Sequence, residues 1–210
     1  MLDYISKQYD KILLYILQHL EIVLLSFVIA VIIAIPIGML ISKKKKLQLP
    51  IVSTFNAIYA IPSLVLYTLL IPFTGLGLKS AVIALVLYSQ FALIKNVAEG
   101  FNGVDSSVIE AGKGMGLSKA QLFFNVELPL ALPVILAGMR LAITTIATTS
   151  VLATSIGAGG LGVLLFDGLR TNNWNKIIVG TILASLFIII VNQIFQKLER
   201  RALKKATGDV

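Results

Sequence analysis

Few residues of this chain are suited to chemistry, and most of those lie within or beside long apolar runs. Arg140 and the hydroxyl-rich stretch 144–150 share one such run. The chain has one histidine, His19, and no cysteine. One imidazole cannot make a zinc site, and no nucleophile has a spacing that suggests an adjacent base. These residue types favour ligand contacts or helix packing over bond-making chemistry, so no metal or cofactor is expected in this chain.

A glycine-rich segment follows the hydroxyl-rich stretch and matches G-x-G-x-x-G at residues 157–162. No strand–helix–strand pattern surrounds it, and the Gly-Lys-Ser/Thr of a phosphate loop is missing, so we reject a nucleotide site. We expect Gly157, Gly159 and Gly160 to form a tight re-entrant turn. In the membrane protein that the composition indicates below, this turn would lie near the outer mouth of the helix bundle, as either part of a gate or a plain packing turn. Such irregular backbone is tolerated at membrane depth where protein or water covers it.

The composition indicates the element that must hold these residues, namely a bundle of membrane helices. Of the 210 residues, 57% are hydrophobic and 13% are charged, whereas soluble domains carry roughly 25% charged residues. The net charge is +8. Basic residues cluster at 43–46 and 197–205 beside apolar runs, which is typical of cytosolic membrane-edge anchors rather than of a nucleic-acid surface.

A spanning helix needs about 20 apolar residues at about 1.5 Å each. Five stretches qualify, and they predict an all-α membrane protein with a transmembrane domain over residues 21–197, followed by a basic cytosolic tail, 198–210. The predicted spans are approximately 22–41, 51–71, 78–97, 130–153 and 177–195. Prolines such as Pro36, Pro62 and Pro133 fall within or near them, which membrane helices tolerate when neighbours satisfy the freed carbonyls.

The distribution of Lys and Arg predicts the orientation. With the N-terminus outside, twelve Lys and Arg residues fall in the cytosol and five outside, while Arg140 lies within a span. The positive-inside rule then predicts N-out and C-in. Residues 1–20 have apolar side chains at helical spacing, so they predict an amphipathic helix on the outer interface; an extension packed against the bundle is the alternative.

A polar island at residues 110–133 separates two apolar runs and falls on the cytosolic side. Ser107-x-x-Glu110 reads as a capping box for a helix that ends at the Gly114-Met115-Gly116 turn. Ser118-x-x-Gln121 reads as a second capping box, for a helix that ends before Leu128-Pro129. The island is either a docking knob for a soluble partner or an ordinary loop packed on its own bundle.

The island resembles the EAA motif of permease subunits of bacterial ABC importers. Glu110-Ala111-Gly112, three residues, Gly116, nine residues and Val126-Glu127-Leu128-Pro129 match that motif in spacing, with Gly112 in place of Ala and Val126 in place of Ile. The resemblance implies that the loop 100–129 carries a coupling helix for a separate ATPase. The residues that it implies for this contact are Glu110, Ala111, Gly112, Lys113, Met115, Gly116 and Leu117.

Residues 20–197 as a whole resemble the permeases of glycine betaine, carnitine and choline importers, on stretches that include Ile61-Pro62-Ser63-Leu64 and Ile156-Gly157-Ala158-Gly159-Gly160. This implies a type I importer permease in a bacterial cell membrane that is not itself an enzyme. It also implies a second permease subunit, ATPase subunits that bind the ATP, and an extracytoplasmic binding protein. A permease for another small solute such as methionine, or an ATP-independent secondary carrier, is the alternative.

In such a permease, Arg140 would lie near mid-membrane, where a charge usually faces a cavity or a partner. It could contact the carboxylate of a zwitterion or form a gate ion pair; a snorkelling or subunit-interface arginine is the alternative. Thr145, Thr148 and Thr149 could line a hydrated path or bond their own helix carbonyls. The tyrosines at 59, 67 and 88 could offer cation–π faces to a quaternary ammonium, or make ordinary core and lipid contacts.

Overall fold

The computed structural model describes residues 2–207, and the regular elements within this range are all helical. The predicted all-α fold class is confirmed. In chain order the elements are α1 (Leu2–Lys43), α2 (Lys45–Ala60), α3 (Ser63–Thr74), α4 (Leu78–Asn102), α5 (Ser106–Gly114), α6 (Lys119–Leu122), a π-helical turn (Phe123–Glu127), α7 (Leu128–Ser150), a 3-10 helix (Leu152–Ile156), α8 (Gly162–Arg170) and α9 (Trp174–Thr207).

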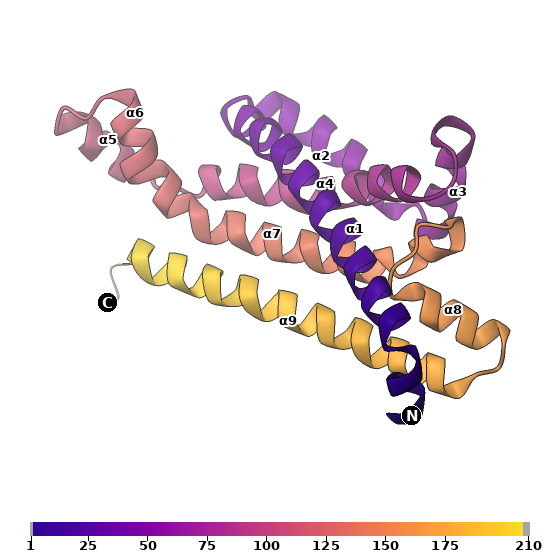
Figure 1. Ribbon diagram of the computed structural model, residues 1–210. Coiled ribbons are helices and arrows are strands. Elements are labelled where there is room, and N and C mark those ends of the chain that lie inside the picture. Colours follow the sequence, from indigo (N-terminus) through magenta and orange to yellow (C-terminus); the bar gives the residue numbers. More distant parts are fainter. Residues whose placement is uncertain (1, 208–210) are drawn as a thin grey trace.

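Helix α4 is the centre of the bundle, because it packs against α1, α2, α3 and α7 (Figure 1). Glycine allows the closest crossings. A Cβ atom at Gly100 would lie 2.9 Å from the carbonyl oxygen of Ala131, and one at Gly138 would overlap the side chain of Asn96. Small residues let membrane helices approach this closely. Helix α7 packs in turn against α9, and α8 packs against α9 near its start.

The separate interfacial helix that we expected over residues 1–20 is absent as a distinct element. One helix runs from Leu2 to Lys43, with non-helical backbone only at Gln8. Residues 18–24 contain no proline, glycine or capping serine that would end a helix. Ile12 is buried against Leu161 and Val179, whereas Leu13 and its neighbours on the other face are exposed. The amphipathic segment therefore packs one face on the bundle, as in the alternative that we considered.

The second predicted span, 51–71, is broken in the structure. Helix α2 ends at Ala60, α3 begins at Ser63, and the two axes differ by 99°. Ile61 between them has extended backbone, the conformation that a following proline imposes. We expected Pro62 to be accommodated within one span, but here it divides the span into two short helices. Among the described residues, four single helices and this bent pair are long and apolar enough to cross a membrane.

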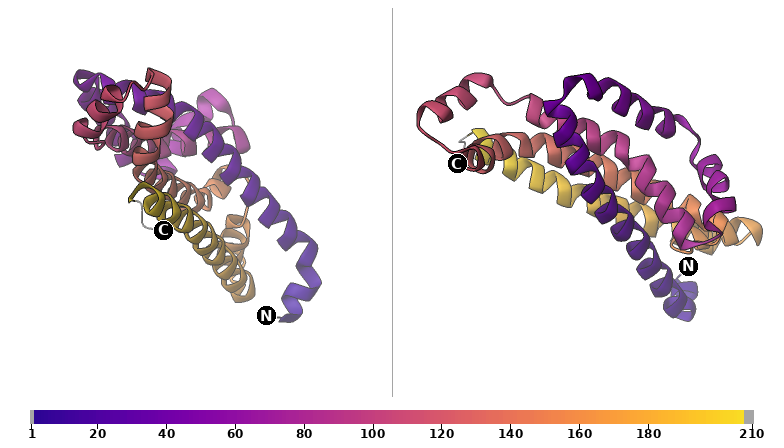
Figure 2. Two further views of the ribbon diagram at one scale, coloured as in Figure 1. Left: turned by 90° about the vertical axis from the view of Figure 1, so that its left-hand side faces the viewer. Right: turned by 90° about the horizontal axis from the view of Figure 1, so that it is seen from above.

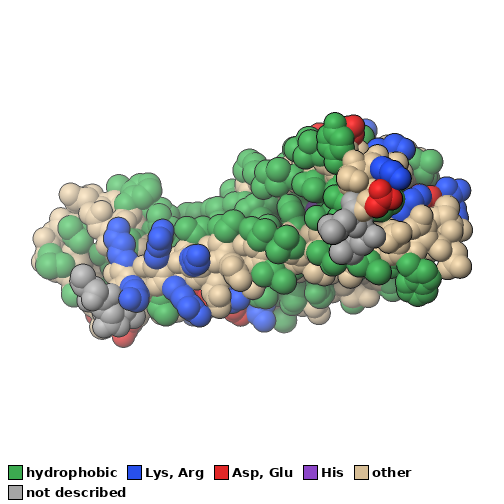
Figure 3. Space-filling model, turned by 60° about the horizontal axis from the view of Figure 1, so that its bottom comes forward, with side chains coloured by type: hydrophobic (Ala, Val, Ile, Leu, Met, Phe, Trp, Pro, Cys, Tyr) green, Lys and Arg blue, Asp and Glu red, His purple; other side chains and the backbone are tan. Residues whose placement is uncertain are grey.

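On the face that Figure 3 shows, hydrophobic side chains cover the middle of the molecule and charged groups gather toward its two ends. Helices α1 and α9 expose leucine and isoleucine side chains such as Leu25, Ile32, Ile182 and Ile189. Helix α9 extends past the predicted span end at 195 and includes most of the basic tail. Figures 1 and 2 show the C-terminal end of α9 at the same end of the molecule as α5 and α6, with the N-terminus and α8 at the opposite end.

Candidate functional site: the α5–α6 projection and the polar groups of the spans

Helices α5 and α6 stand away from the span bundle, and we call residues 105–124 the α5–α6 projection (Figures 1 and 2). Its first helix is not capped as predicted. The side chain of Asp105, not that of Ser107, is the N-cap, and it accepts a 2.8 Å hydrogen bond from the backbone N–H of Ser107. This bond lowers the pKa of Asp105. Aspartate is as good an N-cap as serine, so the residue two positions earlier took the role that we gave to Ser107.

The C-terminal end of α5 is a Schellman motif, at the turn that the sequence predicted. The N–H of Gly116 donates to the carbonyl of Lys113, and that of Leu117 donates to the carbonyl of Gly112 at 3.2 Å. Gly116 has φ of +80°, which glycine adopts without strain. Gly112 is buried under Leu122, and a Cβ there would lie 2.7 Å from the Leu122 Cδ1 atom. The structure therefore uses glycine at a position where an alanine would crowd the second helix.

The second capping box is confirmed. The hydroxyl of Ser118 accepts a hydrogen bond from the N–H of Gln121, and the Gln121 side chain accepts one from the N–H of Ser118. The predicted helix end before Leu128-Pro129 is wrong, because a π-helical turn carries the chain directly into α7. A proline lacks an N–H and clashes with the carbonyl four residues earlier. The wider π turn before Pro129 accommodates both effects without ending the helix.

The surface of the projection is partly apolar. Glu110, Ala111 and Lys113 are exposed, and Met115 is 74% exposed. Sequence reasoning did not single out Val108, which is 41% exposed on the same helix. The two adjacent phenylalanines of the projection, Phe123 and Phe124, point in different directions. Phe123 stacks on Phe101 of α4 with ring centroids 5.8 Å apart, and Phe124 is 63% exposed. The packed ring fixes the projection to the bundle, while the exposed groups remain available to a partner.

Arg140 does not stand alone in the bundle. Its Nε atom lies 2.9 Å from Oε2 of Glu199 on α9. Glu199 lies among the basic residues at the C-terminal end of α9, so Arg140 lies level with this charged end of the molecule. The contact is an ion pair between α7 and α9.

Two of the four threonines of α7 donate their hydroxyls to carbonyls of their own helix. The hydroxyl of Thr144 donates to the carbonyl of Arg140, and that of Thr148 donates to the carbonyl of Thr144 at 2.8 Å. The carbonyl of Thr149 accepts a hydrogen bond from the Tyr67 hydroxyl of α3 at 3.0 Å. Thr148 is exposed, and Thr145 and Thr149 are half-buried. The four threonines are spaced i, i+1, i+4 and i+5, so they lie on one side of α7, and none of them is fully buried.

The glycine segment forms the expected tight turn, and α1 holds it. Gly157, Gly159 and Gly160 all have φ near +80°, which requires glycine. The Gln18 side chain accepts a 3.1 Å hydrogen bond from the N–H of Gly160. The neighbouring His19 is fully buried, packs edge-on against Phe187, and would lie 3.2 Å from a Cβ at Gly160. Sequence reasoning missed Gln18 because nothing local links it to residues some 140 positions later.

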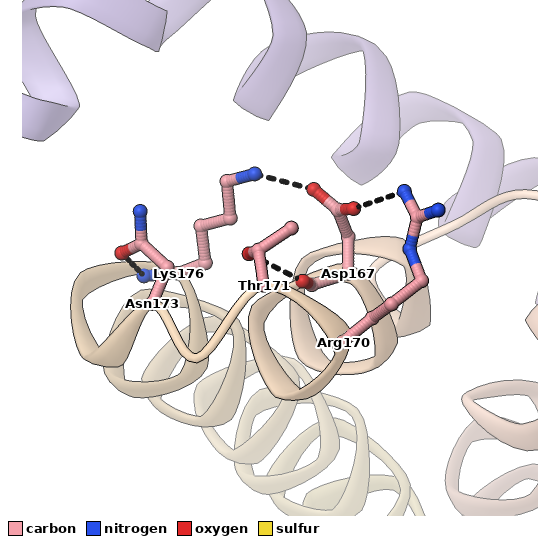
Figure 4. A network of polar contacts seen from close by, with 5 residues as sticks. All are labelled: Asp167, Arg170, Thr171, Asn173 and Lys176. Carbon is pink, nitrogen blue, oxygen red and sulfur yellow. Dashed lines mark hydrogen bonds and ion pairs between the residues drawn. The ribbon is translucent and has the colours of Figure 1, made fainter.

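A polar network joins α8 to the start of α9, at the end of the molecule away from the α5–α6 projection (Figure 4). The Asp167 carboxylate accepts hydrogen bonds from Lys176 and, at 2.9 Å, from Arg170. These bonds, that of Lys176 foremost, lower the pKa of Asp167. The Thr171 hydroxyl donates to the Asp167 carbonyl, and Asn173 accepts from the N–H of Lys176 at the start of α9. The network therefore fixes the turn between α8 and α9.

Comparisons with known proteins agree with this architecture. Residues 15–204 match the family model described as the inner membrane component of binding-protein-dependent transport systems. The chain is 36% identical to a carnitine transport permease protein of Listeria monocytogenes, over 90% of this chain and 87% of that one. It is 34% identical to a choline transport system permease protein of Bacillus subtilis, over 88% and 85% of the two chains.

Among solved structures, a chain of the MetNI methionine ABC transporter in an inward-facing conformation superposes with a TM-score of 0.79 at 20% identity. The match covers 91% of this chain and 95% of that chain. At this identity the match shows a shared fold, that of type I importer permeases. The family match and the permease relatives together show that the chain belongs to the family of binding-protein-dependent transport system inner membrane components, the permease subunits of ABC importers.

Proposed function

We propose that the α5–α6 projection is the surface through which a separate cytosolic ATPase subunit drives this permease. The observation that carries the proposal is the exposure of Met115 and Phe124 on an element that stands clear of the spans. Large apolar side chains exposed on a polar protrusion are typical of a protein contact. Glu110 and Lys113 would supply the charged rim of that contact.

The remaining residues of the motif would act through the shape of the projection. Gly112 packs inside it against Leu122 and Leu117, and Gly116 sets the turn. In this proposal Glu110, Ala111, Lys113 and Met115 touch the ATPase, while the two glycines and Leu117 keep α5 in place. ATP binds to the partner, and this chain carries out no hydrolysis.

The same proposal fixes the orientation in the bacterial cell membrane. The projection and the C-terminal end of α9 share one end of the molecule, which would face the cytosol, and the N-terminus would lie outside. The basic residues near this end agree with the positive-inside rule. A second permease subunit, identical or paralogous, would complete the path, and an extracytoplasmic binding protein would deliver the solute at the end that carries α8.

For the substrate we propose quaternary-ammonium osmoprotectants, namely glycine betaine, carnitine and choline. The support is that permeases named for carnitine and for choline align with most of this chain at more than 30% identity. All these solutes carry a trimethylammonium group, and two of them also carry a carboxylate.

Transport and ATP hydrolysis in reconstituted vesicles test both the coupling surface and the substrate class. The permease with its ATPase and binding protein should hydrolyse ATP faster with glycine betaine, carnitine or choline, but not with methionine. Met115→Asp should abolish ATPase assembly, whereas Met115→Leu should retain it, because only the first places a charge in an apolar contact. Uptake without any ATPase, or normal coupling in Met115→Asp, would contradict the proposed coupling; stimulation by methionine alone would contradict the substrate class.

A further inference from the structure

Three aromatic rings from two helices meet beside the break between α2 and α3. The ring centroid of Tyr59 lies 5.2 Å from that of Tyr88 and 5.6 Å from that of Phe91. The rings are tilted by 50° and 31° rather than stacked face to face. Tyr59 is 41% exposed, and the other two are half-buried. The cluster therefore presents open ring faces at the seam between α2 and α4.

The helix break holds this cluster in place. The hydroxyl of Tyr88 donates a hydrogen bond to the carbonyl of Ile61, which precedes Pro62 and lies outside both short helices. That carbonyl needs a donor from elsewhere, because no helix supplies one. Tyr88 is thereby fixed by a backbone group, and Tyr59 packs against it from the last turn of α2. The aromatic faces are preorganised rather than mobile.

A cation already lies at the edge of the cluster. The ammonium of Lys95 is 5.9 Å from the ring centroid of Phe91, which is within the range of a cation–π contact. Tyr88, Phe91 and Lys95 are spaced i, i+3 and i+7 on α4, so they share one face. Lys95 and its neighbour Glu99 are 3.8 Å apart, and each side chain is nearly half exposed. The Lys95 ammonium can therefore exchange Glu99 for another carboxylate at low cost.

The surroundings indicate a hydrated face rather than a lipid-facing one. Helix α2 has no buried residue, and beside Leu47 and Leu49 it exposes Ser53, Thr54 and Asn56. Helices α1 and α9 expose mainly leucines and isoleucines along their middle turns. Polar side chains within a membrane domain face partner helices or water-filled cavities. A groove of about 290 Å³ continues the seam beyond Lys95; its lining residues are Lys45, Gln48, Leu49, Val52, Lys95 and Glu99.

From these observations we infer that Tyr59, Tyr88 and Phe91 form a binding site for the trimethylammonium group of the solute, with Lys95 binding the carboxylate when the solute has one. The inference rests on the proposed substrate class and deepens it. Aromatic faces attract quaternary ammonium groups because the ring face carries the negative part of the quadrupole. The adjoining ammonium discriminates zwitterions such as glycine betaine from choline, which has no carboxylate.

Equilibrium binding of radiolabelled glycine betaine and choline to the reconstituted permease–ATPase complex, without binding protein, tests the site. Tyr59→Ala should weaken binding of both solutes roughly tenfold, and Tyr59→Phe should leave it nearly unchanged because the ring face remains. Lys95→Gln should weaken glycine betaine alone, again roughly tenfold, and leave choline unchanged or tighter. Tyr9→Ala is the matched control, since Tyr9 is a 62% exposed tyrosine on α1, away from the seam.

The outcomes separate this inference from the proposed function. Wild-type binding in Tyr59→Ala, or equal losses for both solutes in Lys95→Gln, would overturn the site while transport of quaternary ammonium solutes still stands. A wild-type complex that transports these solutes but binds neither without the binding protein would also overturn the site. If the complex neither binds nor transports them with all its partners present, the proposed substrate class fails instead. ATP hydrolysis by each variant complex shows that it is folded and assembled.

Discussion

Replacing Gly116 with alanine should loosen the α5–α6 projection without disturbing the spans. Gly116 has φ of +80°, and a Cβ there would have no atom within 4 Å, so the cost comes from the backbone alone. An L-residue in this left-handed conformation costs about 1–2 kcal/mol. If the whole cost falls on local opening of the projection, the opened fraction rises about 5–30-fold.

Gly114 provides a matched control. It also has open space around its Cβ position, but it is the last helical residue of α5 and has no positive φ. Gly114→Ala should therefore leave the opening unchanged or reduce it, since alanine favours helix by up to about 1 kcal/mol. The assay is amide hydrogen exchange of residues 106–122 in the reconstituted complex, together with transport per ATP hydrolysed. Equal exchange rates in the two variants would refute the argument from backbone conformation.

Three further predictions concern the rest of the molecule. Arg140→Leu should lower the free energy of unfolding by roughly 2 kcal/mol, because it leaves the Glu199 carboxylate without its partner. The double variant Arg140→Leu/Glu199→Leu should recover most of this loss, as measured by thermal unfolding. Additive losses from the two substitutions would contradict an ion pair. A cysteine at Ser6 should react with an impermeant thiol reagent added outside cells, and one at Arg201 only after permeabilisation; the reverse pattern would contradict the proposed orientation. Folding lowers the pKa of Asp167 below its ordinary 3.8, so the stability that the Asp167 carboxylate adds is present above that pH and is lost as the pH falls below it. Asp167→Asn should remove this pH dependence from thermal unfolding. An unchanged pH dependence would contradict the role given to Asp167.

Residues close together in the sequence were predicted well where they form one local structure. The capping box at Ser118 and Gln121 involves residues three apart, and the glycine turn at Gly116 requires one positive φ, so both are properties of a short peptide. The prediction failed at Asp105, where two good capping residues competed and the helix began at the earlier one. It also failed at Pro129, because a π turn was not among the outcomes considered.

The sequence by itself determined that this is an all-helical membrane protein, because the lengths of the apolar runs and the positions of Lys and Arg are read directly from the order of the residues. The tertiary structure alone decided which distant groups meet. Arg140 forms an ion pair with Glu199, nearly 60 residues later, and the N–H of Gly160 donates a hydrogen bond to the Gln18 side chain. The convergence of Tyr59 with Tyr88 and Phe91 depends on the faces that α2 and α4 turn toward each other. Periodicity along one helix cannot specify such pairings, since they are set by how separate helices pack.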